Sequence, residues 1–271
     1  MAESRFDLKG KVALVTGGAG ILGRRFCRGL AGHGASVAIV DIDRTGAERL
    51  ADEIARETGA ATLPVACDLR EPAQVKAMTE TVLAKFGRID VLHNNAAGKS
   101  DNPAAFFARF EDYGLEQWRA IMALDLDTMF LVAQAVGRHM VARGGGGTVI
   151  QTASIYGVLA PDPRIYAGSE YEGRAINTPA VYAVAKAGVI GLTRYLAAYW
   201  APHGIRVNAL SPGGVESGQN ETFRKLYSAR VPMGRMAEAD EMVGALVWLA
   251  SDASSYVTGQ NIVVDGGLTA W

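Results

Sequence analysis

Short apolar runs alternate with helical segments along almost the whole chain, and this alternation limits the possible folds more than any other feature. The runs are apolar at nearly every position rather than at every second one, which is typical of strands buried on both faces. Helices between successive strands make the strands parallel. The sequence predicts an α/β fold with a doubly wound parallel sheet of about seven strands and helices on both faces. The predicted strands are Lys11–Thr16, Ser36–Asp41, Thr62–Cys67, Ile89–His93, Thr148–Thr152, Ile205–Leu210 and Asn261–Val264.

The segments between these runs carry apolar residues at helical spacing. A chain of 271 residues suits one large domain of this kind, and neither an internal repeat nor a low-complexity linker divides it. We therefore expect a single domain over residues 1–271, with ligands beyond the carboxyl ends of the strands. The predicted helices are Arg24–Ala31, Asp43–Thr58, Pro72–Phe86, Leu115–Val141, Pro179–Trp200 and Asp240–Ala250.

The charge balance argues against nucleic acid or a membrane as a partner. The chain has 27 Lys and Arg residues against 28 Asp and Glu residues, for a formal net charge of −1, and it has no basic block. No uninterrupted apolar run approaches the roughly 18 residues of a membrane span. The start of the sequence is polar and lacks the apolar core of a signal peptide, which predicts a cytoplasmic protein.

Cysteine and histidine show no metal-binding pattern. Cys27 and Cys67 are isolated, which favours two buried thiols in a reducing compartment. The histidines share no ligand spacing, so we predict no metal ion. They are His33, His93, His139 and His203.

A glycine-rich loop follows the first predicted strand and opens the first helix. Its sequence is Thr16-Gly17-Gly18-Ala19-Gly20-Ile21-Leu22-Gly23. Glycines let the backbone approach a pyrophosphate, whose charge is met by exposed amides at the helix N-terminus. Because the loop lies in the first strand–helix–strand unit, it predicts a dinucleotide site rather than a turn without a ligand.

Asp41 ends the second predicted strand, 18 residues beyond Gly23. A carboxylate at this place accepts hydrogen bonds from both ribose hydroxyls of the adenosine and repels a 2′-phosphate. The sequence therefore favours NAD over NADP. Arg24 and Arg25 are the nearby cations that could weaken this preference, and both are assigned to the helix.

Tyr182 and Lys186 are spaced for proton transfer. They stand at i and i+4 of a predicted helix, so both project from one face. The ammonium of Lys186 is expected to lower the pKa of the Tyr182 phenol from about 10 toward neutrality. The hydroxyl of Ser154, 28 residues upstream of Tyr182, could hold the substrate oxygen. The tyrosine–lysine pair alone is a weak signal, and the nucleotide motifs give it weight.

Together with three further motifs, these residues resemble the short-chain dehydrogenase/reductase family, in its single-domain branch, over nearly the whole chain. The further motifs are Asn94-Asn95-Ala96-Ala97-Gly98, Ser211-Pro212-Gly213 and Val264-Asp265-Gly266-Gly267. The resemblance implies a single-domain Rossmann fold and an NAD-dependent oxidoreductase. It also implies that Asp68 contacts the adenine. Family members are commonly tetramers, so a homotetramer or homodimer is expected.

The resemblance also implies a set of residues that contact the cofactor. This cofactor contact set consists of Gly17, Gly20, Ile21, Leu22, Gly23, Asp41, Ile42, Asp68, Leu69, Asn95, Ala96, Ala97, Tyr182, Lys186, Pro212, Gly213 and Val215.

The chain departs from the family pattern at three places. Ile21 stands where the single-domain branch has glycine, which gives the spacing of the longer epimerase and dehydratase branch. Ala97 replaces the glycine of the Asn-Asn-Ala-Gly motif. Asp125 stands where the family has an asparagine that completes a proton relay to the lysine. A carboxylate there would raise the pKa of Lys186 and weaken its effect on Tyr182. Asp125 is a candidate member of the catalytic set.

The reaction implied is reversible hydride transfer between NAD(H) and a carbon that bears a hydroxyl or carbonyl group. Tyr182 would be the general acid/base, Lys186 would tune it, and Ser154 would orient the substrate oxygen. Two alternatives stay open. The glycine spacing is also that of nucleotide-sugar epimerases and dehydratases, which retain their NAD. A catalytically silent NAD-binding subunit is the other alternative, and the intact catalytic set argues against it.

Two segments carry the substrate prediction. The family has its serine about a dozen residues before the tyrosine, so residues 157–179 contain an insertion beside the site. The insertion could bind a polar substrate, bind a neighbouring subunit, or be a solvated loop. Tyr156, just before the insertion, could line the pocket or pack beneath the catalytic helix. Residues 214–232 are predicted as a lid with a helix at Glu221–Arg230. Polar side chains of the lid favour a sugar, sugar acid or polyol over a lipid. They are Glu216, Gln219, Asn220 and Arg224.

Overall fold

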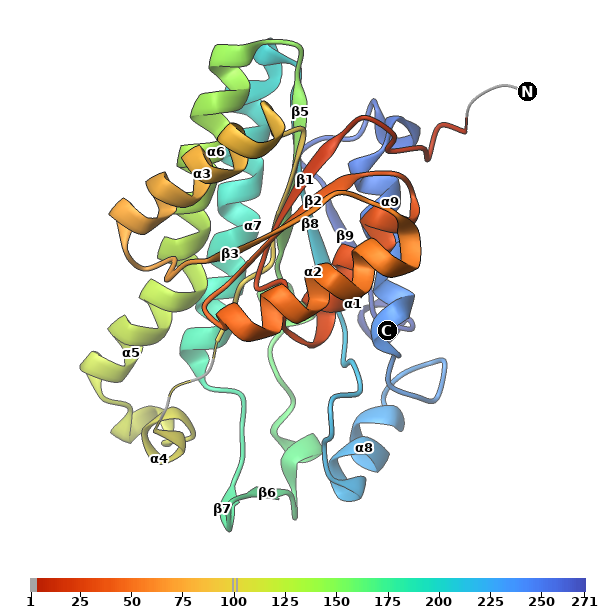
Figure 1. Cartoon of the computed structure of the whole chain (residues 1–271). Coiled ribbons are helices and arrows are strands. Elements are labelled where there is room, and N and C mark those ends of the chain that lie inside the picture. The colour runs from red at the N-terminus through yellow and green to blue at the C-terminus, as the bar shows by residue number, and fades with distance from the viewer. Residues whose placement is uncertain (1–3, 99, 101) are drawn as a thin grey trace.

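The computed structural model describes residues 4–98, 100 and 102–271. A parallel sheet of seven strands in the order β3-β2-β1-β4-β5-β8-β9 forms its centre (Figure 1). The order in which successive strands are added reverses between β1 and β4, and such folds bind their ligands at this point. The predicted doubly wound α/β fold is confirmed. The strands are β1 (Val12–Thr16), β2 (Ser36–Asp41), β3 (Thr62–Ala66), β4 (Val91–Asn94), β5 (Gly147–Thr152), β8 (Ile205–Pro212) and β9 (Asn261–Val264).

The strands are apolar throughout because both faces of the sheet are covered. Val15 and Ile39 pack on one face with α1 (Ile21–Gly32), α2 (Arg44–Thr58) and α9 (Val243–Ala250). Their neighbours Leu14 and Val40 point to the opposite face, as successive strand residues do. That face is covered by α3 (Pro72–Phe86), α6 (Thr128–Arg143) and α7 (Ala180–Trp200).

The long helical stretch predicted at Leu115–Val141 is divided. It begins as α5 (Leu115–Met122), continues through a π-helical turn at Ala123–Asp127 and ends as α6. By length and composition alone, Leu115–Arg143 could cross a membrane. Its α6 part instead packs on the sheet between α3 and α7. A Cβ at Gly137 would lie 2.3 Å from the ring of Trp200 on α7, so α6 and α7 approach closely there.

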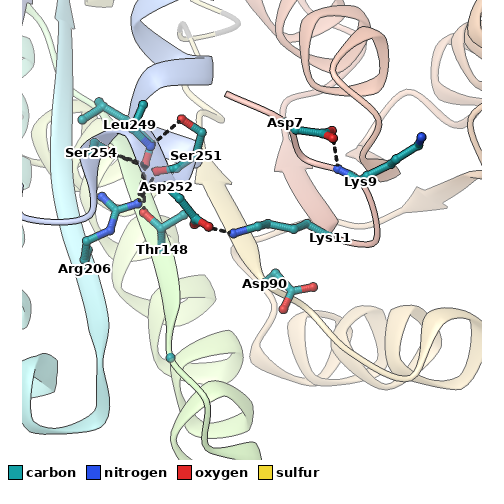
Figure 2. A network of polar contacts seen from close by, with 12 residues as sticks. Asp7, Lys9, Lys11, Asp90, Thr148, Arg206, Leu249, Ser251, Asp252 and Ser254 are labelled. Atoms are coloured by element: carbon teal, nitrogen blue, oxygen red, sulfur yellow. Dashed lines mark hydrogen bonds and ion pairs between the residues drawn. The ribbon is translucent and has the colours of Figure 1, made fainter. Parts of the chain in front are cut away.

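A polar network fastens the C-terminal end of α9 to the amino ends of the central strands (Figure 2). The Arg206 guanidinium on β8 donates to the backbone oxygens of Leu249 and Ser251 at 2.9 and 3.2 Å. Lys11, before β1, pairs with Asp252 at 2.8 Å. The Arg206 guanidinium thereby satisfies buried carbonyls at the end of the helix, where the last carbonyls lack helical partners. They lie at the edge of the sheet opposite the carboxyl ends.

The predicted insertion forms a small element beyond the carboxyl ends of the strands, beside α8 (Glu221–Ser228) (Figure 1). It contains a 3-10 turn, η4 (Pro163–Tyr166), and a hairpin of β6 (Glu170–Tyr171) and β7 (Arg174–Ala175). The hairpin turn has positive φ at Glu172 and Gly173, as tight two-residue hairpin turns require. Neither this hairpin nor the short helix α4 (Pro103–Phe106) was predicted.

Candidate active site

The glycine loop between β1 and α1 is shaped by two close backbone contacts. A Cβ at Gly17, which has φ +62°, would lie 2.9 Å from the Cα of Ala96. A Cβ at Gly23 would lie 1.9 Å from the backbone oxygen of Gly17, so no other residue fits. Ile21 has an exposed side chain at the first position of α1. The departure from the family spacing at Ile21 therefore leaves the tight turn intact.

The carboxylate of Asp41 is held at the end of β2 by two backbone amides. Ala19 of the glycine loop donates to its Oδ2 at 2.9 Å, and Asp43 donates to its Oδ1 at 3.0 Å. Both nearby cations have other partners. Arg24 donates to the backbone oxygen of Ala19 at 2.8 Å, and Arg25 pairs with Asp240 at 3.4 Å.

Hydroxyl and amide side chains tie the carboxyl ends of β1, β4 and β5 together. Thr16 Oγ1 accepts hydrogen bonds from the backbone amides of Asn95 and Ala96 at 2.9 and 3.0 Å. Thr152 Oγ1 donates to Asn95 Oδ1 at 3.2 Å. Its backbone oxygen accepts from Lys186 Nζ at 3.3 Å. These contacts fix the strand ends on which the cofactor contact set lies.

Ser154, Tyr182 and Lys186 meet although 28 residues separate the first two in the sequence. Ser154 lies two residues beyond β5, and Tyr182 and Lys186 lie on consecutive turns of α7. Ser154 and Tyr182 line the same two cavities, and Lys186 Nζ lies 5.7 Å from the centre of the Tyr182 ring. Lys186 is buried.

The expected lowering of the Tyr182 pKa by Lys186 is wrong for this structure. Burial raises the pKa of Tyr182, the neighbouring Ser154 hydroxyl lowers it, and the charge of Asp125 adds to the increase. Burial also lowers the pKa of Lys186. The cost of removing phenolate from water therefore exceeds the gain from its neighbours.

Asp125 lies in the π-helical turn between α5 and α6 and is fully buried. Its Oδ1 accepts from the Gly98 amide at 3.0 Å, and its Oδ2 has no hydrogen-bond partner among the described residues. Burial raises the pKa of Asp125, and the charge of Lys186 lowers it. The charge of Asp125 in turn raises the pKa of Lys186 against the effect of burial, in the expected direction.

A cavity of about 760 Å³ runs along the carboxyl ends of the strands. Every residue of the cofactor contact set lines it, and so does Ser154. It extends from Asp41 and Asp68 at one end to Tyr182 at the other. Backbone approach at Gly17 and Gly23, with a fixed acceptor at Asp41, fits a dinucleotide.

A second cavity of about 360 Å³ adjoins the first and shares Ser154, Tyr182 and Gly213 with it. We call it the substrate cavity. Tyr156 lines it, which decides between the two expectations for this residue. Of the four polar lid residues, Gln219 alone lines it, while Glu216 and Arg224 are exposed and Asn220 caps α8. Further lining comes from the insertion, with Tyr166, Ile176, Asn177 and Thr178, and from α8, with Phe223 and Tyr227.

The sequence reasoning missed Phe106 and Phe107, which line the substrate cavity from the end of α4. Their one local signal is Asn102-Pro103, a helix cap followed by proline at the first helical position. The same segment contains Lys99 and Asp101, which lie outside the described residues.

Comparison with known proteins gives matches over nearly the whole chain. The family model described as enoyl-(acyl carrier protein) reductase matches residues 17–269. The D-threitol dehydrogenase of Mycolicibacterium smegmatis is 36% identical over 97% of this chain and 95% of its own length.

Two solved structures have similar folds. The gluconate 5-dehydrogenase from Burkholderia cenocepacia, in complex with NADP and tartrate, has a TM-score of 0.85 at 37% identity and covers 98% of each chain. NAD⁺-bound xylitol dehydrogenase has a TM-score of 0.83 at 29% identity, over 96% of this chain and 99% of its own. With the site described above, these matches show that the chain belongs to the short-chain dehydrogenase/reductase family, whose members are oxidoreductases with nicotinamide cofactors.

Proposed function

We propose that the protein is an NAD-dependent dehydrogenase of a sugar, sugar acid or polyol. The observation that carries this proposal is that Ser154 and Tyr182 line both cavities. A substrate in one cavity therefore meets a cofactor in the other beside the phenol. The relatives are named for threitol, gluconate and xylitol, which supports a polyhydroxylated substrate.

The chemical roles follow from the contacts of the catalytic set. A nicotinamide cofactor held by the cofactor contact set would supply the hydride-transfer chemistry. Tyr182 accepts the hydroxyl proton in oxidation and returns it in reduction. Ser154, which lines both cavities with the phenol, holds the same substrate oxygen and stabilises its developing charge. Lys186 supplies a buried positive charge 5.7 Å from the Tyr182 ring, and the charge of Asp125 acts to raise the pKa of both groups.

The preference for NAD rests on Asp41. Its carboxylate is fixed by Ala19 and Asp43 in the place where a 2′-phosphate would add negative charge. Arg24 and Arg25, which could have balanced that charge, are engaged elsewhere. Relatives with NAD and with NADP both occur, so this residue is the basis of the proposal.

The remaining assignments concern the parts around the site. We assign residues 1–271 to one cofactor-binding domain, residues 157–179 to a substrate-pocket insertion and residues 214–232 to a lid. Phe130 on α6 and Tyr195 and Tyr199 on α7 are large exposed apolar residues that line one groove. Such a patch supports a homodimer or homotetramer. The cytoplasmic location stays a prediction.

An activity screen over polyols, aldonates and sugars, run with NAD and with NADP, tests the proposal. NADH formed in amounts that exceed the enzyme many times over is the expected result. NAD that stays bound through purification, with no net NADH, would instead indicate the epimerase or dehydratase alternative. Binding of NADH detected by fluorescence, with no oxidation of any compound, would indicate the silent subunit.

A further inference from the structure

The insertion completes a chain of three hydroxyl groups in the wall of the substrate cavity. Tyr156 lies two residues after Ser154, Tyr166 lies in η4, and Thr178 lies near the end of the insertion, before α7. The Tyr166 phenol is hydrogen-bonded to Thr178 Oγ1, and the Tyr156 and Tyr166 phenols are near enough for each to shift the pKa of the other. All three side chains line the cavity that contains Ser154 and Tyr182. We call them the hydroxyl chain.

The hydroxyl chain can both donate to a ligand and accept from it. Three hydroxyls carry three protons, and the bond between Tyr166 and Thr178 uses one of them. Protons therefore stay available, together with acceptor lone pairs. A hydroxyl group of a ligand can use both because it donates once and also accepts, whereas a carboxylate can only accept.

The rest of the cavity wall suits a neutral ligand with C–H faces. Aromatic rings of Phe107, Phe223 and Tyr227 form much of it, and no described residue that lines it carries a charge. Pockets of this composition bind by apolar contact and use a few polar groups to orient the ligand. The hydroxyl chain and the pair Ser154–Tyr182 are such groups.

The insertion is held in place by contacts that do not involve the hydroxyl of Tyr166. The Tyr166 ring packs on the Phe223 ring of α8 with centroids 5.5 Å apart. Asp162 pairs with Arg230 at 2.7 Å. Near the other end of the insertion, Asn177 Nδ2 donates to the backbone oxygen of Phe107 at 2.9 Å. Removal of the Tyr166 hydroxyl should therefore leave the cavity wall in place.

We propose that the hydroxyl chain Tyr156–Tyr166–Thr178 binds a second hydroxyl of a neutral polyol while Ser154 and Tyr182 hold the hydroxyl that is oxidised. Tyr166 is then a specificity-determining residue supplied by the insertion. The inference rests on the proposed dehydrogenase function and narrows its substrate class from sugars, sugar acids and polyols to neutral polyols.

The test compares substrates that differ by one hydroxyl. We expect Tyr166→Phe to lower kcat/KM for a neutral polyol by about 10- to 100-fold, because a site built for a hydroxyl is left with unpaired groups. For the deoxy analogue that lacks the second hydroxyl, we expect less than about a threefold change. Thr178→Val should show the same selectivity. Tyr171→Phe, an exposed tyrosine of the same insertion, should change neither value.

Equal losses on the polyol and on its deoxy analogue would overturn the inference, because they would indicate a structural role for Tyr166. So would a wild-type preference for an aldonate over the corresponding polyol. Neither result would contradict the proposed dehydrogenase function. A wild-type protein that oxidises neither substrate, nor any aldonate or sugar, would overturn the function and the inference together.

Discussion

Asp125 and Lys186 are both buried, and each offsets the effect of burial on the pKa of the other. Burial raises the pKa of Asp125, and Lys186 lowers it. Burial lowers the pKa of Lys186, and Asp125 raises it. The family's usual asparagine at position 125 would provide no such charge. In this protein the Asp125 charge therefore helps to keep Lys186 protonated.

Replacement of Asp125 by asparagine should shift the pH dependence of alcohol oxidation. The amide oxygen can still accept from Gly98, but a charge that raises the pKa of Tyr182 is gone. Because oxidation requires phenolate, the pKa on the acid limb of kcat/KM should fall in Asp125→Asn. Profiles of kcat/KM against pH measure this pKa. Asp127→Asn, an exposed neighbour, is the control. An unmoved acid limb would refute the role of Asp125, and an upward shift would show that its effect on Lys186 outweighs its direct effect on Tyr182.

Asp41 should decide the choice of cofactor. Asp41→Asn removes the charge that repels a 2′-phosphate, so the ratio of kcat/KM with NAD to that with NADP should fall by about 10-fold or more. Asp43→Asn is a matched control, because it removes a nearby charge while asparagine still caps α2. If the ratio of kcat/KM with NAD to that with NADP changed equally in both variants, the cause would be a general effect of negative charge and not a contact between Asp41 and the ribose.

Asp90 should stabilise the opposite edge of the sheet in a pH-dependent way. Burial would raise its pKa, but hydrogen bonds from Arg88, from the Val12 amide and from Arg143 lower it overall. Its side chain is 8% exposed, with Arg88 and Arg143 at 2.6 and 2.7 Å. Asp90→Asn should lower the unfolding free energy by about 1.5–3 kcal/mol at neutral pH.

The sign of the pH effect at Asp90 follows from the lowered pKa. The contribution of the carboxylate is complete above the pKa of the unfolded state, about 3.9, and is lost as pH falls through the lower folded value. Denaturant unfolding should therefore show a smaller difference in unfolding free energy between wild type and Asp90→Asn near pH 3 than near pH 7. An equal difference at the two pH values would argue against the ion pairs as the source of the stabilisation.

The predicted site residues that the structure brings together belong to local motifs at strand ends. Gly17, Asp41 and Ser154 each follow or end a strand, and parallel strands bring those ends to one edge of the sheet. The substrate cavity depends instead on contacts between distant segments, such as Tyr166 with Phe223. The direction of the Tyr182 pKa shift depends on burial, which cannot be read from a sequence motif. These parts could not be predicted from spacing alone.

The exposed tyrosines of α7 should mediate assembly. Tyr195 and Tyr199 are 64% and 62% exposed, and their rings stack with centroids 5.8 Å apart. A charge at this position should be costly in a buried interface, so Tyr199→Asp should lower the molar mass measured by light scattering. Tyr256→Asp, at a fully exposed site elsewhere, should leave the mass unchanged. A monomeric wild type would contradict the proposed oligomer.

The most direct test of the account is the activity of Tyr182→Phe measured beside its affinity for NADH. Phenylalanine keeps the ring but removes the hydroxyl that adjoins Ser154. We predict that kcat/KM for alcohol oxidation falls by about 10²- to 10⁴-fold, while the Kd for NADH, measured by fluorescence, stays within about threefold of the wild-type value. Near wild-type activity in Tyr182→Phe would contradict the claim that this phenol transfers the proton.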